Sequence, residues 1–321
     1  MISLQKINVL AATVLALCLA SMTTSAQNYV ANITRQQSAR SDKLTGGRIE
    51  KTALIPGDPD VKITVNVPAF QLTLWQNGKE VKTYFVGVGM KDYPIYIGER
   101  EASDIIWNPN WVPPDSDWVE GHKGVTAGEI IKPTDPRNPL GKLKIPLGDG
   151  YLIHQAKGID DLGSLVSHGC VRMLKPDLYD LAEKIVAARS LPLTKKQIET
   201  AKLTSDTLAA TLDPTVPVEI TYDTHVVEAG RLHIYPDIYD FKTNTVENLR
   251  RELESNNIDD SRITDSDLER ILSRAVNKKQ FVVSTANIEA GRETSGGQIL
   301  PVVTTSVTQQ NKKSAVKKTR A

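Results

Sequence analysis

The chain has 321 residues, which is enough for one large domain or two small ones. Hydrophobic residues make up 40% of the sequence, so the composition allows a buried core. The 39 basic side chains nearly balance the 38 acidic ones, for a formal net charge of +1. This balance excludes a global basic excess of the kind that favours nucleic acid, and we expect no nucleic-acid partner.

Residues 1–26 have the pattern of a secretory signal peptide. Lys6 supplies a positive charge, residues 7–20 are mostly apolar, and small residues lead to a cleavage site after Ala26. The apolar run is shorter than the roughly 20 residues that a membrane span needs. We therefore expect export through a cleaved signal peptide, with no transmembrane anchor in the mature chain. An uncleaved N-terminal anchor is the alternative interpretation.

Export changes how the two cysteines are interpreted. Cys18 would be removed with the signal peptide, which leaves Cys170 without an intramolecular partner. A lone thiol in an oxidising compartment is either paired between molecules or a free reactive group. A buried structural cysteine, acting as a small hydrophobic residue, is the third possibility. The count alone leaves these alternatives open, and the residues around Cys170 favour the reactive one.

Residues 27–60 are polar and predict a flexible N-terminal segment. Strand patterns begin at Val61, and Asn77-Gly78 predicts a tight turn that joins strands over residues 72–75 and 81–88. These strands alternate apolar and polar residues, which is typical of a sheet with one buried face.

The region 94–146 is rich in Pro, Gly and Trp, so we expect mostly loop there, with short strands at best. A buried strand is expected over residues 151–154. Five further predictions follow along the chain: a helix opening at Pro176, a helix from Thr194 to about Ala210, strands over 218–222 and 232–235, helices over 246–255 and 265–276, and loss of periodicity beyond about Thr285.

The most informative segment is residues 167–173, with the sequence Ser-His-Gly-Cys-Val-Arg-Met. A thiol becomes a nucleophile where an imidazolium or another positive charge favours its thiolate, and His168 and Arg172 flank Cys170. Gly169 lacks a Cβ, so a tightly turned backbone there can direct N–H groups at an oxyanion beside the sulfur. His154 lies sixteen residues before Cys170, at the end of a predicted strand, and is the candidate base.

His168 and Cys170 are also residue types that bind zinc. The other histidines outside the two motifs, His122, His225 and His233, show no ligand spacing, and the sequence contains no Cys-x-x-Cys pair. We therefore expect neither a metal site nor a cofactor.

Residues 150–154 and 167–173 together resemble the signature of the L,D-transpeptidase catalytic domain, the YkuD-type family. The resemblance extends through residues 138–141 and 107–114 back to the strand at Val61, so it covers roughly residues 61–190. It implies an α+β fold with a mainly β, sandwich-like catalytic domain. Residues 237–239, Asp-Ile-Tyr, resemble the segment that follows this domain in some Gram-negative members.

The residue patterns and the resemblance together give the expected domain organisation. The expected parts are a signal peptide (1–26), a flexible segment (27–60), the catalytic domain (61–190), an accessory C-terminal region (191–285) and a disordered basic tail (286–321).

Residue roles carry over from the family motif. Cys170 matches the nucleophile that forms a thioester, and His154 matches the histidine that activates it. Gln155 would orient the imidazole through its backbone carbonyl, although the family more often has Gly or Ser there, and its longer side chain would reshape the acceptor side of the pocket. The remaining matches are Ser167, His168 and Gly169, which line the oxyanion and substrate region, and Arg172, which supports the catalytic loop or substrate carboxylates.

The implied reaction is acyl transfer on peptidoglycan in the periplasm. Cys170 would attack the tetrapeptide stem at the L-centre of the position-three diamino acid and release D-Ala. An amine would resolve the thioester, either from another stem, giving a 3-3 cross-link, or from a lysine of an outer-membrane lipoprotein. The same thioester also allows an L,D-carboxypeptidase or exchange enzyme, or a hydrolase that releases lipoprotein. A non-catalytic wall-binding protein is the remaining alternative.

Overall fold

The computed structural model describes residues 60–121 and 124–304, all within the unit formed by residues 51–321. The predicted signal peptide, the flexible segment up to residue 59 and the last part of the basic tail lie outside the described residues. No helix among the described residues has the length and apolar character that a membrane span requires.

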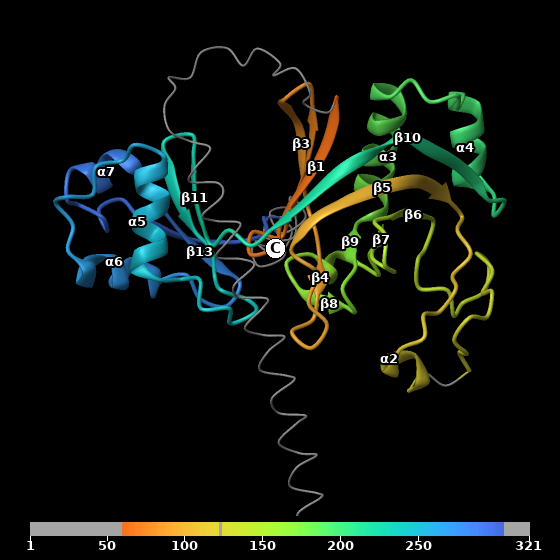
Figure 1. The fold of residues 1–321 in the computed structure, drawn as a ribbon, viewed down its shortest axis with the longest axis horizontal. Coiled ribbons are helices and arrows are strands. Elements are labelled where there is room, and N and C mark those ends of the chain that lie inside the picture. The colour runs from red at the N-terminus through yellow and green to blue at the C-terminus, as the bar shows by residue number, and fades with distance from the viewer. Residues whose placement is uncertain (1–59, 122–123, 305–321) are drawn as a thin grey trace, which may run out of the picture. The chain divides into compact units, whose positions relative to one another are not determined.

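The larger sheet contains eight strands within the described residues (Figure 1). They are β1 (Val61–Asn66), β2 (Gln71–Gln76), β3 (Lys79–Phe85), β5 (Gly98–Trp107), β6 (Leu143–Pro146), β7 (Leu152–Gln155), β9 (Val171–Met173) and β10 (Leu208–Thr221). Their spatial order is β3-β2-β1-β10-β5-β6-β7-β9. The pairs β1–β10 and β7–β9 are parallel and the other pairs are antiparallel. A separate small sheet pairs β4 (Val88–Gly89) with β8 (Leu165–Ser167) in parallel.

The first strands follow directly from the sequence pattern. In β1 the residues Val61, Ile63 and Val65 are fully buried and alternate with partly exposed ones. The predicted hairpin is confirmed as β2–β3, and Asn77 and Gly78 have φ values of 51° and 71°. Positive φ at both central residues is what a type I′ turn requires, which explains the Asn-Gly pair.

Helix α3 (Lys175–Ala188) buries the apolar face that the sequence predicts and packs against β6 and β7. It begins with Pro176 in its first turn, where the missing N–H costs nothing. Helix α4 (Lys195–Leu203) begins with the predicted capping box between Thr194 and Gln197. It ends before the expected Ala210, because β10 begins at residue 208.

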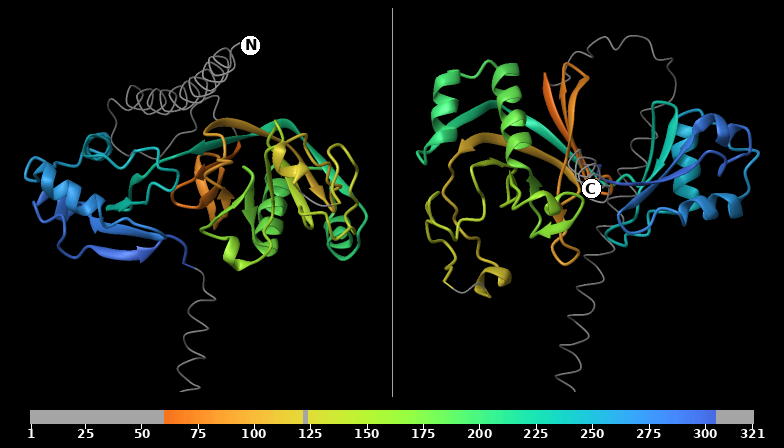
Figure 2. Two further views of the ribbon diagram at one scale, coloured as in Figure 1. Left: turned by 90° about the horizontal axis from the view of Figure 1, so that it is seen from below. Right: turned by 180° about the vertical axis from the view of Figure 1, so that it is seen from behind.

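Residues 225–301, called the C-terminal region from here on, form a second sheet with three helices inside the same unit (Figure 2). Its strands are β11 (His225–Glu228), β12 (Arg231–Ile234), β13 (Lys279–Ser284) and β14 (Gln298–Pro301), and its helices are α5 (Val246–Ser255), α6 (Asp265–Leu272) and α7 (Thr285–Glu289). The strands pair in chain order and are all antiparallel. Leu232 and Val283 are register partners whose side chains join those of the helices in one hydrophobic core.

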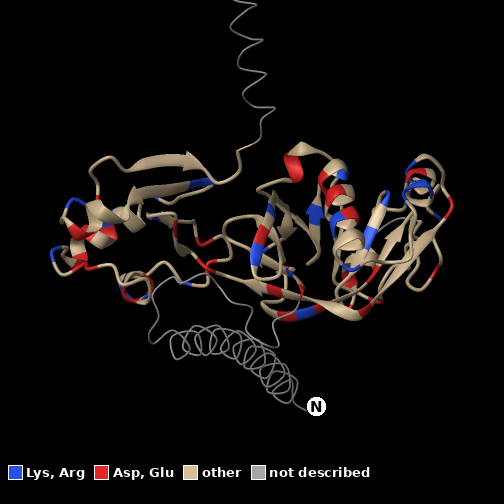
Figure 3. Cartoon of the chain, turned by 90° about the horizontal axis from the view of Figure 1, so that it is seen from above, with Lys and Arg blue, Asp and Glu red and all other residues tan. Residues whose placement is uncertain are grey.

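Acidic and basic side chains are interspersed along the described elements (Figure 3). Asp180 of α3 accepts hydrogen bonds from Lys82 and Tyr84 of β3, both at 2.9 Å, and pairs with Lys184 at 3.0 Å. These contacts tie the β2–β3 hairpin to α3. Partly exposed ion pairs of this kind contribute little to stability, so they mainly fix orientation.

The α+β class with a mainly β catalytic part is confirmed. The structure differs from the prediction in one predicted loop and in two domain boundaries. The region 94–146 contains the ten-residue strand β5, since pairing with β10 and β6 outweighs its Gly-rich and Pro-rich flanks. The sheet does not end at residue 190, because β10 lies between β1 and β5. Residues 286–304 are not a disordered tail, because β14 pairs with β13 and most of α7 falls there.

Candidate active site

The parallel neighbours β7 and β9 bring the two sequence motifs together. His154 of β7 is the register partner of Arg172 of β9, and on the other side of β7 it lies opposite Lys144 of β6. Register partners share one face of a sheet, so these three side chains form a row across three strands. Cys170 lies two residues before Arg172, directly before β9 begins, and the charge of Arg172 acts on both His154 and Cys170.

Cys170 directly precedes β9 and is partly buried. Burial raises the pKa of its thiol, because surroundings of low dielectric constant disfavour the thiolate. A backbone N–H of Leu152 and the positive charge of Arg172 act in the opposite direction but do not outweigh burial. The thiol is therefore protonated at neutral pH and needs a base before it can act as a nucleophile.

The His154 side chain, the candidate base, is neutral at neutral pH. The residue is 4% exposed, and burial together with the charge of Arg172 lowers its pKa to about 3. The Gln155 backbone and Asp161 act in the opposite direction. Its Nδ1 atom is buried and meets no hydrogen-bond partner among the described residues. A neutral imidazole beside a neutral thiol can accept the sulfur's proton as the attack proceeds.

Gly169 allows a backbone approach that no other residue permits. Its φ is +103°, and a Cβ there would lie 2.8 Å from Cε1 of Tyr151. Gly89 of β4 packs against it, since a Cβ at Gly89 would lie 3.1 Å from the Gly169 Cα and 2.3 Å from the Tyr93 carbonyl oxygen. The predicted tight backbone at Gly169 is therefore present, with no space for a side chain at either glycine.

Ser167 closes the turn that contains Gly169. Its hydroxyl donates to the Cys170 carbonyl at 2.6 Å, and its own carbonyl accepts the Met90 N–H at 2.8 Å. The residue is only 2% exposed. The Ser167 hydroxyl thus holds the turn, and its place in the substrate region stays a prediction.

His168 lies in an aromatic stack. Its ring stacks on Trp118 with centroids 4.2 Å apart, and Tyr93 meets it edge-on at 4.7 Å. Trp118 belongs to α2 (Asp117–Glu120) and also stacks with Trp111 at 6.3 Å. The stack thus fixes the His168 ring between Trp118 of α2 and Tyr93, which come from two other segments of the chain.

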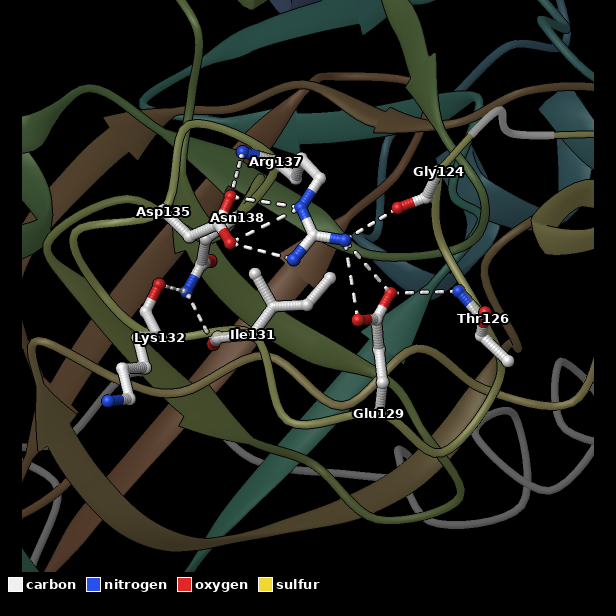
Figure 4. A network of polar contacts seen from close by, with 8 residues as sticks. All are labelled: Gly124, Thr126, Glu129, Ile131, Lys132, Asp135, Arg137 and Asn138. Atoms are coloured by element: carbon white, nitrogen blue, oxygen red, sulfur yellow. Dashed lines mark hydrogen bonds and ion pairs between the residues drawn. The ribbon is translucent and has the colours of Figure 1, made fainter.

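A polar network joins residues of the 124–138 loop (Figure 4). Arg137 donates hydrogen bonds to three groups: the Asp135 carboxylate at 2.7 Å, the Glu129 carboxylate at 3.2 Å and the Gly124 carbonyl at 2.5 Å. The Asn138 amide donates to the carbonyl of Ile131 at 3.4 Å. Ile131 forms a small hydrophobic core with Trp111 and Leu140, against which Trp118 packs. The network therefore supports the position of Trp118 on His168.

Arg172 is engaged with the protein on two sides. Its guanidinium pairs with Asp161 at 3.3 Å, and both side chains are nearly buried, at 12% and 13% exposure. Its backbone exchanges hydrogen bonds with Gly87 at 2.8 and 2.9 Å. Asp161 ends the 3₁₀ helix η1 (Ile159–Asp161) and also accepts the Lys157 N–H at 2.8 Å. Support of the loop accounts for these contacts, and a role for Arg172 with substrate carboxylates stays a prediction.

The Gln155 side chain is used within the fold. Its Oε1 accepts the Lys142 N–H at 2.9 Å, and a Cβ at Gly141 would lie 2.6 Å from the Gln155 Cβ. The backbone N–H of Gln155 donates to Leu140 at 3.2 Å. These contacts hold the side chain within the fold, and the expectation that it reshapes the acceptor side of the pocket stays a prediction.

The histidines of the C-terminal region have structural surroundings. His233 contacts Gln280 at 2.9 Å, while burial lowers the pKa of His225 to about 4. Across residues 60–121 and 124–304, no group of three or more His, Cys, Asp or Glu side chains is arranged to hold a metal ion.

A model of the YkuD family, described as the L,D-transpeptidase catalytic domain, matches residues 60–220. The match covers 161 of the 321 residues and includes both strands of the candidate site. The chain belongs to this family. Its YkuD domain ends with β10, which agrees with the position of that strand inside the larger sheet.

Two curated relatives of this YkuD protein come from Escherichia coli strain K12. The probable L,D-transpeptidase YbiS is 26% identical over 144 residues, which are 43% of this chain and 45% of that protein. The probable L,D-transpeptidase YcfS is 26% identical over 153 residues, 46% of this chain and 48% of that protein. The chain thus spans about half the length of the curated relatives it matches. The solved catalytic domain of the E. faecium L,D-transpeptidase aligns with 51% of this chain and 98% of its own, at 15% identity and a TM-score of 0.32.

Several residues of this YkuD site were not found from the sequence. Gly89 and Lys144 approach the two motifs only through pairing and packing of distant segments. The two glycines in Gly87-Val88-Gly89 are a signal of close backbone approach within a strand, and Lys144 alternates with buried Leu143 and Ile145. The aromatic partners of His168 leave no comparable local signal.

Proposed function

We propose that this chain is an exported L,D-transpeptidase that uses Cys170 as its nucleophile and His154 as its base. The observation that supports the proposal is the parallel register of β7 and β9, in which His154 is the partner of Arg172, two residues after Cys170. Membership of the YkuD family supports the reaction class, and both relatives are named probable L,D-transpeptidases.

In the first half of the proposed reaction, the Cys170 thiol gives its proton to His154 while the sulfur attacks the carbonyl carbon. The carbonyl is that of the L-centre of the diamino acid at position three of a tetrapeptide stem. The carbonyl oxygen takes up the negative charge, and backbone N–H groups near Gly169 stabilise it. When the C–N bond breaks, His154 returns the proton to the amine of the departing D-Ala, and a thioester stays on Cys170.

In the second half, an acceptor amine attacks the thioester carbonyl and gives a proton to His154. The C–S bond breaks, and the proton returns to the Cys170 sulfur. The acceptor we propose is the side-chain amine of another stem, which makes a 3-3 cross-link, or a lysine of an outer-membrane lipoprotein. Both acceptors, and the periplasm as the place of the reaction, are part of the proposal.

The charges around the site suit an anionic peptide. Lys144 and Arg172 flank His154 in the row across the sheet. Arg172 is largely neutralised by Asp161, whereas the Lys144 ammonium donates to the Asn110 carbonyl at 3.3 Å. Burial lowers the pKa of Lys144, although the negative charge of Asp104 acts in the opposite direction. A nearby substrate carboxylate would further stabilise the charged form of Lys144.

The test is incubation of the mature chain with defined tetrapeptide muropeptides, with and without a lysine-bearing acceptor peptide, followed by mass spectrometry. We expect D-Ala release by the wild type, new cross-linked dimers or acceptor adducts, and no product with Cys170→Ala. Tripeptides as the only product would instead favour the L,D-carboxypeptidase. No turnover by either form, with equal peptidoglycan binding, would contradict the proposal and leave the wall-binding alternative.

A further inference from the structure

Residues 237–241, here called the Tyr239 segment, follow β12 and are held by a hydroxyl at the end of β10. The Tyr222 hydroxyl donates to Asp237 Oδ1 at 2.6 Å and accepts the Tyr239 N–H at 2.7 Å. The same Asp237 oxygen accepts the Phe241 N–H at 3.0 Å. The rings of Tyr222 and Tyr239 stack with centroids 5.6 Å apart. The segment is thus a well-defined turn fixed to the larger sheet.

The Tyr239 side chain extends from this turn to the loop formed by residues 89–95. Its hydroxyl donates to the Gly89 carbonyl at 2.8 Å and accepts the Ile95 N–H at 3.4 Å. Tyr239 is 7% exposed, so these backbone groups have little access to water as a substitute partner. One hydroxyl therefore connects the first and last residues of the 89–95 loop.

The 89–95 loop packs in turn against the residues that directly precede Cys170. Gly89 meets Gly169 backbone to backbone, and the Met90 N–H donates to the Ser167 carbonyl at 2.8 Å. The Tyr93 ring lies edge-on to His168. Neither glycine has room for a side chain, so the two backbones are close together. A displacement of the Gly89 backbone would therefore displace the Gly169 backbone as well.

We propose that Tyr239, from the C-terminal region, is a positioning residue for Cys170. It holds the 89–95 loop in the place that fixes the Gly169 backbone beside the thiol. The inference rests on the proposed function for its kinetic consequence. It gives the C-terminal region a part in the active site, because the catalytic domain then depends on a residue beyond β10.

The direct test is Tyr239→Phe, which removes only the hydroxyl and leaves the Gly89 carbonyl and the Ile95 N–H without this partner. The matched control is Tyr235→Phe, because Tyr235 is similarly buried, at 3% exposure, and its hydroxyl makes no hydrogen bond to a described residue. Misplacement of reacting groups by about 1 Å can cost about 100-fold in rate. We expect Tyr239→Phe to lower kcat for D-Ala release about tenfold or more, with KM within twofold, and Tyr235→Phe to leave both unchanged.

A second measurement separates this inference from the proposed function. Alkylation of Cys170 by iodoacetamide, followed from pH 6 to 10, reports the surroundings of the thiol without any cell-wall substrate. We expect the pH profile to shift in Tyr239→Phe and to match the wild type in Tyr235→Phe. If the wild type releases no D-Ala, the proposed function fails, and this profile alone decides the role of Tyr239.

The inference is overturned if folded Tyr239→Phe has a wild-type profile and, where the wild type is active, wild-type kcat. Should Tyr239→Phe fail to fold, Tyr222→Phe tests the same anchor, because it removes the acceptor of the Tyr239 N–H. The alkylation profile should then shift in the same direction, and an unchanged profile in folded Tyr222→Phe would count equally against the inference.

Discussion

His154 and Arg172 are register partners on neighbouring parallel strands, and the arginine's charge helps to lower the pKa of the histidine to about 3. Burial is the larger cause, and burial also raises the pKa of the Cys170 thiol. The imidazole and the thiol are therefore both neutral at neutral pH, and they do not form a thiolate–imidazolium pair. In the proposed mechanism His154 then takes the proton during the attack, and this sets the first two predictions.

Replacement of His154 by Gln removes the base while keeping a side chain of similar size. We expect D-Ala release to fall by about 10² to 10⁴, the usual contribution of a positioned base. Initial rates at pH 7.5 on a tetrapeptide muropeptide measure this effect. A His154→Gln variant with more than a tenth of the wild-type rate would show that another group deprotonates the thiol.

The reactivity of Cys170 towards a small alkylating agent should follow the raised pKa of the thiol. Because the thiolate is the reactive form, the rate should keep rising from neutral to alkaline pH. Stopped assays with iodoacetamide and intact-mass detection give the profile. A plateau already reached below pH 7 would indicate a preformed thiolate and would contradict the neutral pair.

Two buried histidines should make the fold sensitive to acid. Folding lowers the pKa of His154 to about 3 and that of His225 to about 4, from an ordinary value near 6.5. Between the folded and unfolded pKa values of each histidine, the unfolded state binds more protons than the folded state. The free energy of unfolding therefore falls as the pH drops below about 6.5. Each histidine should cost about 2 kcal/mol at pH 5 relative to neutral pH.

Urea unfolding at pH 7 and pH 5 checks this linkage. His225→Gln lies away from the two motifs, and it should lose less stability between the two pH values than the wild type does. Equal losses in both proteins would mean that His225 does not contribute.

A methyl group at Gly169 should disrupt the site more than the fold. Gly169→Ala places a Cβ 2.8 Å from the Tyr151 ring at a φ of +103°. We expect a loss of about 1–3 kcal/mol in unfolding free energy, the usual cost of such backbone strain, together with a severe loss of D-Ala release. The matched control is Gly78→Ala, which also has positive φ but has open space around its Cβ, and which should retain activity.

The Gln155 side chain can be tested by substitution. Gln155→Ser introduces a residue type that the family resemblance predicts at this position, but it removes the acceptor of the Lys142 N–H. We expect unfolding free energy to fall by about 1 kcal/mol, with D-Ala release within threefold of the wild type. A large change in acceptor choice without a stability change would instead place the Gln155 side chain in the pocket.

Local rules account for the parts of the fold that the sequence predicts well. The Asn77-Gly78 turn, the Thr194 capping box and the apolar face of α3 each depend on residues close together in the chain. The length of β5 and the place of β10 depend on pairing between distant segments. The composition near residue 107 therefore did not indicate the long strand β5, and the helix that begins near residue 195 did not indicate that β10 follows it.

The candidate site divides in the same way. Cys170, His154 and Gly169 belong to two short motifs with recognisable chemistry, and the sheet brings those motifs together. Tyr239 lies 150 residues from Gly89, and no local pattern links them. The motif predicted a place for His168 beside the oxyanion. It could not predict the ring contact with Trp118, because Trp118 belongs to α2, a distant segment of the chain.

The central claim is that Cys170 becomes acylated, and intact-mass spectrometry of the mature chain with a carbapenem tests it most directly. A carbapenem offers a strained carbonyl that an activated thiol opens, so the acyl-enzyme forms without an acceptor amine. We predict one adduct on the wild type, located on Cys170 by peptide mapping, and none on Cys170→Ala. No adduct on a chain whose Cys170 is shown to be reduced, or an equal adduct on Cys170→Ala, would contradict the account.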